Sequence, residues 1–211
     1  MSLDLELPGA AETRRLLRVL ARPAVEAAPR LLGQVLVRRL GRRVLAARIV
    51  ETEAYLGSAD PAAHAFRGRT RRTEPLWGPP GTVYVYFVYG MHYCLNLAVD
   101  REGVPECVLV RAAEPLAGDL DPLACRGPGR LCRALGLDTR QSGSRLFSPG
   151  TRLFLREGPP PLRIGCSPRV GIRLAAEAPL RYFDADSKAV SSLRPPRAPA
   201  SRRRRRPPSR R

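Results

Sequence analysis

The stretch from Tyr84 to Val99 reads YVYFVYGMHYCLNLAV, and it predicts a β-hairpin. Apolar and aromatic residues fill both halves, and a Tyr-Gly pair between them supplies the turn. Alternation places Tyr84 and Tyr86 on one strand face and the neighbouring valines on the other. We therefore expect strands over residues 83–88 and 92–99, joined at a tight turn.

A second pair of strands is predicted upstream, where GQVLVRRLGRRVLAARIVETEAY spans residues 33–55 and turns at a Leu-Gly-Arg triplet. Alternation in the second of these strands places Ile49, Glu51 and Glu53 on one face. A carboxylate on the inward face of a strand is costly unless it has a partner or a task. Spacing alone does not choose between the two glutamates.

The remaining elements are short. We expect helices over residues 12–20, 24–32 and from 130 onward, and further strands over 106–116, 152–156, 170–174 and 179–183. Strands outnumber long helices, and their spacing favours hairpins over βαβ units. The predicted fold is α+β, a single mixed domain around a curved, mainly antiparallel β-sheet with peripheral short helices and a protruding β-hairpin.

Composition divides the chain into three parts. We expect residues 1–12 to form a flexible N-terminal arm, residues 13–192 the domain, and residues 193–211 a disordered tail rich in Arg and Pro. The tail holds nine arginines and no acidic residue, so it carries half of the net charge of +18. The remainder is also basic, which predicts a polyanionic partner.

Targeting and metal signals are absent from the sequence. The N-terminus lacks an apolar signal region, and the most apolar run is too short to span a bilayer, so we expect a cytoplasmic protein without a membrane partner. The five cysteines form no CxxC motif, and there are only two histidines. We therefore expect no metal site.

Several motifs in order resemble one family. They are RIVETEAYLGSADPAAHAFRG, GPPGTVYVYFVYGMHYCLNLAV, CVLVRAAEPLAG, GPGRLCRALGLD and PRVGI. Together they are similar to the alkyladenine (3-methyladenine) DNA glycosylase family, over about residues 16–192. The resemblance implies base-excision repair: a monomer without cofactors that flips alkylated or deaminated purines out of duplex DNA, hydrolyses the N-glycosidic bond and leaves an abasic site.

The resemblance also implies roles for individual residues. Glu53 matches the general base that activates a water, and Glu51 is then expected to form a salt bridge. Arg111 and the backbone carbonyl of Val170 match positions that hold the water and the flipped nucleotide. Three side chains match walls of the base pocket: Tyr55, His64 and Tyr86.

Other matches concern selectivity and DNA distortion. Asn96 matches a residue that crowds the exocyclic amine of guanine, and Leu109 matches an apolar residue near the pocket. Tyr89 matches a wedge that enters the DNA beside the flipped nucleotide, with Met91 near the same tip. Tyr84 and Tyr93 are assigned to packing.

Two alternatives and two departures accompany this interpretation. A non-catalytic nucleic-acid-binding protein could use the same basic face and hairpin, and an RNA-binding domain related to formyltransferases could share a barrel-like sheet. The single lysine, Lys188, lies far from the motifs, which favours a monofunctional enzyme, since strand-cleaving glycosylases use an amine nucleophile. The segment after Val170 is shorter than the resemblance implies, and the tail has no match.

Overall fold

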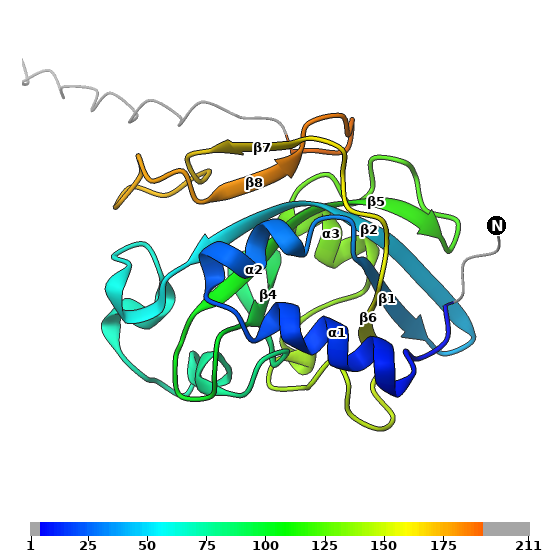
Figure 1. The fold of residues 1–211 in the computed structure, drawn as a ribbon, viewed down its shortest axis with the longest axis horizontal. Coiled ribbons are helices and arrows are strands. Elements are labelled where there is room, and N and C mark those ends of the chain that lie inside the picture. The colour runs from blue at the N-terminus through cyan, green and yellow to red at the C-terminus, as the bar shows by residue number, and fades with distance from the viewer. Residues whose placement is uncertain (1–4, 192–211) are drawn as a thin grey trace, which may run out of the picture.

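A curled antiparallel β-sheet runs through the structure, a computed structural model that describes residues 5–191 (Figure 1). Its main path follows the order β3-β4-β5-β2-β1-β6, and β8 pairs with both β2 and β7. This arrangement confirms the predicted α+β fold. The strands are β1 Val35–Leu40, β2 Arg43–Tyr55, β3 Val83–Val88, β4 His92–Ala98, β5 Cys107–Ala117, β6 Leu153–Arg156, β7 Ile164–Ser167 and β8 Arg181–Asp184.

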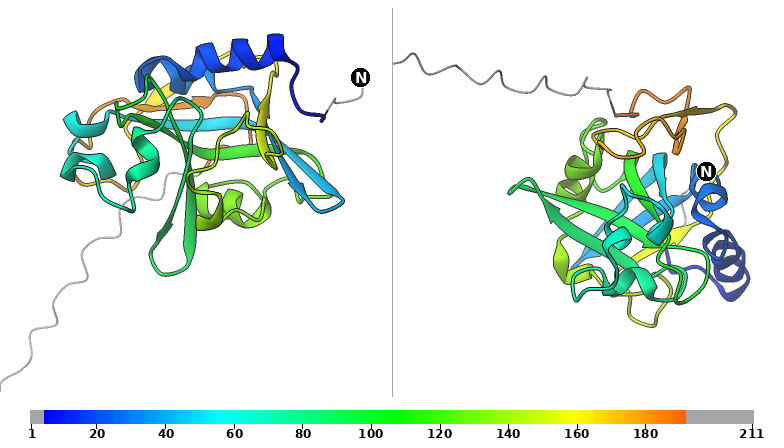
Figure 2. Two further views of the ribbon diagram at one scale, coloured as in Figure 1. Left: turned by 90° about the horizontal axis from the view of Figure 1, so that it is seen from below. Right: turned by 90° about the vertical axis from the view of Figure 1, so that its left-hand side faces the viewer.

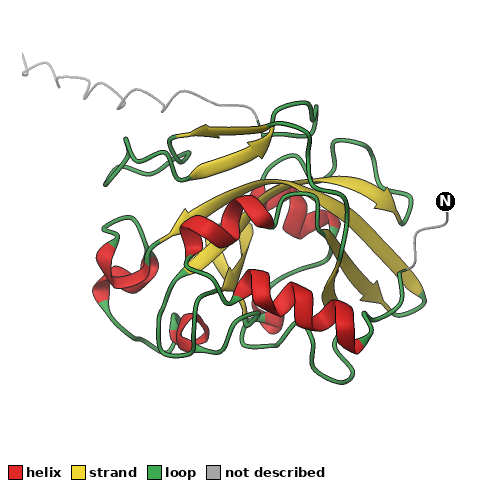
Figure 3. Cartoon of the chain, viewed as in Figure 1, coloured by secondary structure: helices red, strands yellow, loops and turns green. Residues whose placement is uncertain are grey.

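Short helices lie around the sheet (Figure 3). The α-helices are α1 Ala10–Leu20, α2 Ala24–Arg30 and α3 Pro128–Ala134, and the 3-10 turns are Gly57–Ala59, His64–Arg67, Glu74–Trp77 and Thr139–Gln141. In α1, Leu16 and Leu20 lie one turn apart and are buried in the main core. Helix α3 lies on the other side of the molecule from α1 (Figure 2), and its Leu131 belongs to the same core. The helices therefore close the curled sheet over one continuous core.

The hairpin of β3 and β4 projects from the body of the domain (Figure 2). Val83 and Val85 point into the main core, whereas Tyr84 and Tyr86 belong to a separate aromatic cluster, as alternation predicts. At the tip, Tyr89 has φ 53° and Gly90 has φ 69°. Positive φ at consecutive residues suits a tight hairpin turn, but it is strained for a tyrosine. Strain of this kind persists mainly at functional sites.

Two β-bulges correct the prediction that Ile49 shares a face with Glu51 and Glu53. The pairing of β2 with β5 shifts between Ile49 and Glu51, and it shifts again between Glu51 and Thr52, opposite Arg111. Ile49 packs in the main core before the bulges. Beyond them, Thr52 faces α2, and its hydroxyl donates to the Ala28 carbonyl. Bulges re-aim side chains. Here they turn both glutamates and the arginine away from the main core.

Several boundaries differ from the sequence predictions. Helix α1 begins at Ala10, inside the segment expected to be an arm, and Glu12 accepts a hydrogen bond from Arg156 Nε at 2.9 Å. The strand expected over residues 170–174 is wrong, because Pro168 and the positive φ of Gly171 interrupt an extended run. Strand β7 replaces it. The predicted tail lies outside the described residues, and the three-part division of the chain stays a prediction.

Candidate active site

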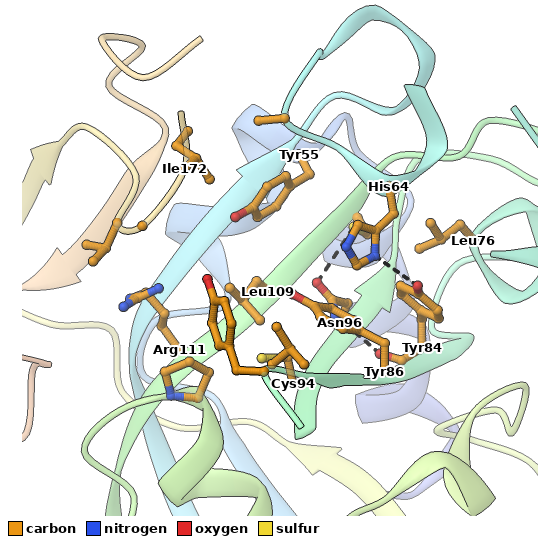
Figure 4. A pocket seen from close by; sticks show the side chains of 17 residues that line it. Tyr55, His64, Leu76, Tyr84, Tyr86, Cys94, Asn96, Leu109, Arg111 and Ile172 are labelled. Carbon is orange, nitrogen blue, oxygen red and sulfur yellow. Dashed lines mark hydrogen bonds between the residues drawn. The ribbon is translucent and has the colours of Figure 1, made fainter. Parts of the chain in front are cut away.

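A cavity of about 340 Å³ opens between the hairpin, β5 and the segment after β7 (Figure 4). Every residue predicted for the base pocket lines it, which brings together positions from residue 55 to residue 170. Its lining includes Tyr55, His64, Tyr84, Tyr86, Tyr89, Asn96, Leu109, Arg111 and Val170. Pockets of this size accept small organic ligands. Tyrosines and His64 supply most of the lining, and Arg111 supplies its charged side chain.

Glu53 is not among the residues that line the cavity, but three of its contacts are, namely Tyr55, Arg111 and Val170, and its side chain is fully buried. One carboxylate oxygen, Oε1, accepts the Val170 backbone N–H at 2.8 Å and lies 3.3 Å from Arg111 Nη1. The other, Oε2, accepts the Tyr55 hydroxyl at 3.0 Å. Burial raises the pKa of Glu53 above its usual value, and Arg111, the Val170 N–H and the Tyr55 hydroxyl oppose that rise. A raised pKa makes the ionised carboxylate a stronger base.

The structure adds detail to three sequence predictions here. Val170 contacts Glu53 through its N–H, whereas the sequence prediction concerned its carbonyl. Tyr55 was expected only as a pocket wall, yet it donates to Glu53 from the same strand face. The expected salt bridge of Glu51 is confirmed, with Arg111 Nε at 3.0 Å and Arg181 Nε at 2.6 Å.

The aromatic side of the cavity is built by three rings that contact one another. His64 meets Tyr86 edge to face at 4.3 Å between ring centroids, and its Nδ1 lies 2.9 Å from the Tyr84 hydroxyl. Burial, and then the nearby charge of Arg72, lowers the pKa of His64, so the ring is neutral at neutral pH. Burial raises the pKa of Tyr84 to about 12, and Tyr86 shifts in the same direction. The pocket therefore offers uncharged π faces.

The floor of the cavity comes from β4 and β5. Asn96 is buried, and its Nδ2 donates to the Tyr84 carbonyl at 3.3 Å. The Asn96 side-chain oxygen lies 3.8 Å from Cys107 Sγ. Leu109 stands opposite Asn96 in the β4–β5 pairing and lines the same floor. These contacts hold the Asn96 amide in place, so the side chain does not easily move aside for a larger ligand.

The hairpin tip presents apolar surface to solvent. Tyr89 is 79% exposed and Met91 is 70% exposed, and Tyr89 also borders the cavity. Tyr93, which was assigned to packing, is half-buried and contacts Phe87 at 5.1 Å between ring centroids. A large exposed ring next to a pocket is suited to contact a macromolecular partner.

Sequence reasoning missed Arg169 and underrated Tyr84. Arg169 is buried, forms an ion pair with Asp60, and places its guanidinium 4.6 Å from the centroid of the Tyr55 ring. It also precedes Val170, so it anchors the segment that reaches Glu53. The PRVGI motif was the one available signal for Arg169. For Tyr84, the signal was its shared strand face with Tyr86.

An aromatic pocket, a buried carboxylate held by residues of its lining and an exposed ring at its rim fit the DNA glycosylase class that the sequence resembles. The sequence model of the family described as methylpurine-DNA glycosylase (MPG) matches residues 18–188. The chain belongs to the methylpurine-DNA glycosylase family, and it is a DNA-repair protein that binds DNA.

Curated relatives agree with this assignment. A protein of Myxococcus xanthus named "Putative 3-methyladenine DNA glycosylase" is 46% identical over 181 residues, which cover 83% of this chain and 92% of the relative. A relative of the same name in Methanocella arvoryzae is 41% identical over 82% of this chain and 94% of the relative. Another, in Koribacter versatilis, is 45% identical over 78% of this chain and 86% of the relative.

Two features of residues 5–191 concern a membrane span and a metal site. No helix in this part of the chain is long and apolar enough to cross a membrane. Across the same residues, no group of three or more His, Cys, Asp or Glu side chains is arranged to hold a metal ion. Independence from metals and cofactors stays a prediction.

Proposed function

We propose that the protein hydrolyses the N-glycosidic bond of alkylated or deaminated purines of the 3-methyladenine class in duplex DNA, acting as a monomer in the cytoplasm on nucleoid DNA. The observation that carries this proposal is the position of Glu53, a buried carboxylate at the edge of an aromatic cavity with Arg111 and the Val170 N–H on one of its oxygens.

The cavity suits a flat, electron-poor ring. Tyr55, His64 and Tyr86 line it from two sides, and aromatic faces attract alkylated purines that carry positive charge. A neutral His64 adds no repulsion against such a cation. Asn96 lies on the floor, where its fixed amide would collide with the exocyclic amine of guanine. Undamaged guanine is thereby rejected.

Glu53 acts as the general base in this proposal. It accepts a proton from a water whose oxygen forms a bond to C1′ of the sugar, while the C1′–N bond breaks and its electron pair leaves with the purine. A cationic base departs neutral, whereas a neutral base such as hypoxanthine also takes up a proton. The ionised carboxylate also stabilises positive charge that develops on the sugar. Arg111 and Val170 hold the water and the nucleotide beside it.

The hairpin tip supports base flipping. Extruding a nucleotide costs a few kcal/mol of stacking and pairing. The Tyr89 ring, exposed at the tight turn, would fill the space that the nucleotide leaves, with Met91 packing beside it. Tyr89 also borders the cavity, so the space that its ring fills in the DNA lies next to the pocket that holds the flipped base.

Strand cleavage is not part of the proposal. A lyase step needs an amine nucleophile, and the side chains that line the cavity in the described part of the chain include no lysine. Lys188 is exposed. The test incubates the protein with duplexes that each carry one modified purine, and measures free base and strand breaks separately. We expect released base with intact strands until alkali is added. Strand breaks without alkali, or a borohydride-trapped adduct, would refute the monofunctional reaction.

A further inference from the structure

A buried cluster of charges lies next to Glu53, and the proposed mechanism uses only one of its members. At its centre is Glu51, whose side chain is fully buried. Its Oε1 accepts hydrogen bonds from Arg111 Nε at 3.0 Å, Arg181 Nε at 2.6 Å and Ser191 Oγ at 2.8 Å. Its Oε2 accepts the Ser191 backbone N–H at 2.6 Å. Both carboxylate oxygens are therefore satisfied.

This bonding determines how Arg111 is oriented. Its Nε is directed to Glu51, so its Nη1 is left to reach Glu53 at 3.3 Å. A guanidinium is planar with its donors in fixed directions, so fixing Nε fixes where the Nη groups point. Arg111 also stands at the second bulge, where the backbone of β5 is irregular and constrains it less than a regular ladder would.

We propose that Glu51 is a positioning residue for base hydrolysis: it divides the charge of Arg111 between two carboxylates and keeps Glu53 basic. The proposal rests on the proposed function. Without Glu51, both ends of the Arg111 fork can turn onto Glu53, and a bidentate pair of that kind is strong. The Glu53 carboxylate would then hold Arg111 in place of a water.

Ser191 extends the cluster to the last described residue. It bonds Glu51 through both its N–H and its hydroxyl, and its Oγ lies 3.3 Å from Arg111 Nε. Just before it, Ala189 packs with Val50 and Ala112, which flank the shift in the β2–β5 pairing. Ser191 lies beyond residues 18–188, the part that the family model matches. The end of the described chain therefore helps to build the site.

The sign of the expected pH effect follows from charge. Burial is the main cause of the raised pKa of Glu53, to which the charge of Glu51 adds, and Arg111 is the strongest influence that lowers it. Replacing Glu51 with a neutral side chain removes the charge of Glu51 and strengthens the influence of Arg111, so the pKa of Glu53 falls. Base release needs ionised Glu53, so the acid limb of its pH profile moves to lower pH. Among the other groups around Glu53, the substitution leaves Tyr55, Cys94 and Arg169 in place. Arg181 loses its carboxylate partner Glu51, which adds positive charge near Glu53 and acts in the same direction.

The experiment compares Glu51→Gln with a matched control, Glu114→Gln, by single-turnover base release across pH. Glu114 resembles Glu51, since it bonds an arginine and a serine hydroxyl, but its partners are Arg48, at 2.6 Å from Nη2, and Ser187 rather than Arg111. For Glu51→Gln we expect a rate about tenfold to a hundredfold lower at neutral pH and an acid limb about one pH unit lower. Glu114→Gln should keep the parent profile.

A second variant covers the case in which Glu51→Gln fails to fold. Ser191→Ala removes the hydroxyl that contacts both Glu51 Oε1 and Arg111 Nε and keeps the backbone N–H. Glu51 and Arg111 are then held less firmly, so a smaller shift in the same direction is expected. An acid limb at the parent position in the variants that fold would overturn the positioning role while leaving the proposed function intact. A parent protein that releases no base would overturn the proposed function, and this inference with it.

Discussion

Replacing Tyr89 with alanine separates DNA capture from folding. The ring is 79% exposed, so its removal should change the free energy of unfolding by less than about 0.5 kcal/mol. Inserted into DNA, a tyrosine buries roughly 150 Å² of ring surface, and at about 25 cal/mol per Å² the upper bound is about 4 kcal/mol. Stacking measured by alanine substitution is about 1–3 kcal/mol.

We take about 2 kcal/mol, which corresponds to roughly 30-fold weaker binding of a lesion duplex. The assay is fluorescence anisotropy with a lesion-containing duplex, combined with a thermal melt of the free protein. Leu162→Ala is the control, since it removes a side chain that is 98% exposed away from the hairpin. The Tyr89→Gly variant adds a backbone test. Glycine relieves the positive φ, so its melting temperature should equal or exceed that of Tyr89→Ala.

Equal affinity of Tyr89→Ala and the parent for the lesion duplex would refute the wedge. A large drop in the melting temperature of Tyr89→Ala would show instead that the ring supports the fold. Either outcome would remove the assignment of the hairpin tip to base flipping.

Three further predictions concern charge. The Glu53→Gln variant should have a melting temperature at or above that of the parent at pH 7.5, because burial raises the pKa of Glu53 and so makes the ionised carboxylate destabilising in the folded state. Measured by calorimetry, the difference in melting temperature should disappear as the pH falls to 4.5, the usual pKa of the group. A lower melting temperature for the variant at pH 7.5 would contradict this. The Arg169→Met substitution should lower the free energy of unfolding in urea by about 3–5 kcal/mol, because it leaves the Asp60 carboxylate buried without its ion-pair partner. Adding Asp60→Asn should restore part of that free energy, and an unchanged free energy in Arg169→Met would contradict the stabilising role of the pair. Deleting residues 193–211 should flatten the salt dependence of DNA binding by about 0.9 units of slope for each phosphate that the tail neutralises, and an unchanged slope would show that the tail does not touch phosphate.

The sequence predicted the hairpin well because its signals are local. Tyr84 and Tyr86 alternate with valines, and a Tyr-Gly pair suits the turn, so the aromatic face followed from strand geometry alone. The grouping of Tyr55, His64 and Arg111 at one cavity came from the family resemblance, since no local pattern relates positions so far apart. The structure brings these residues together at that cavity.

The remaining features depend on tertiary structure. The bulges near Val50 and Arg111 have no glycine or proline to signal them, and they reverse the face on which Glu51 and Glu53 lie. The bond from the Val170 N–H to Glu53 joins residues that are 117 positions apart. Strand β7 is four residues long with a glycine inside it, and too short for alternation to be visible.

The most direct test of the account is the Glu53→Gln variant, with base release and DNA binding measured side by side. The glutamine keeps the shape of the side chain but cannot accept a proton at neutral pH. We expect single-turnover release of 3-methyladenine from duplex DNA to fall by about a hundredfold to ten-thousandfold. Affinity for the lesion duplex should stay within about threefold of the parent, since a substitution of nearly equal shape leaves the pocket and the hairpin tip in place. Release at the parent rate would contradict the assignment of Glu53 as the general base.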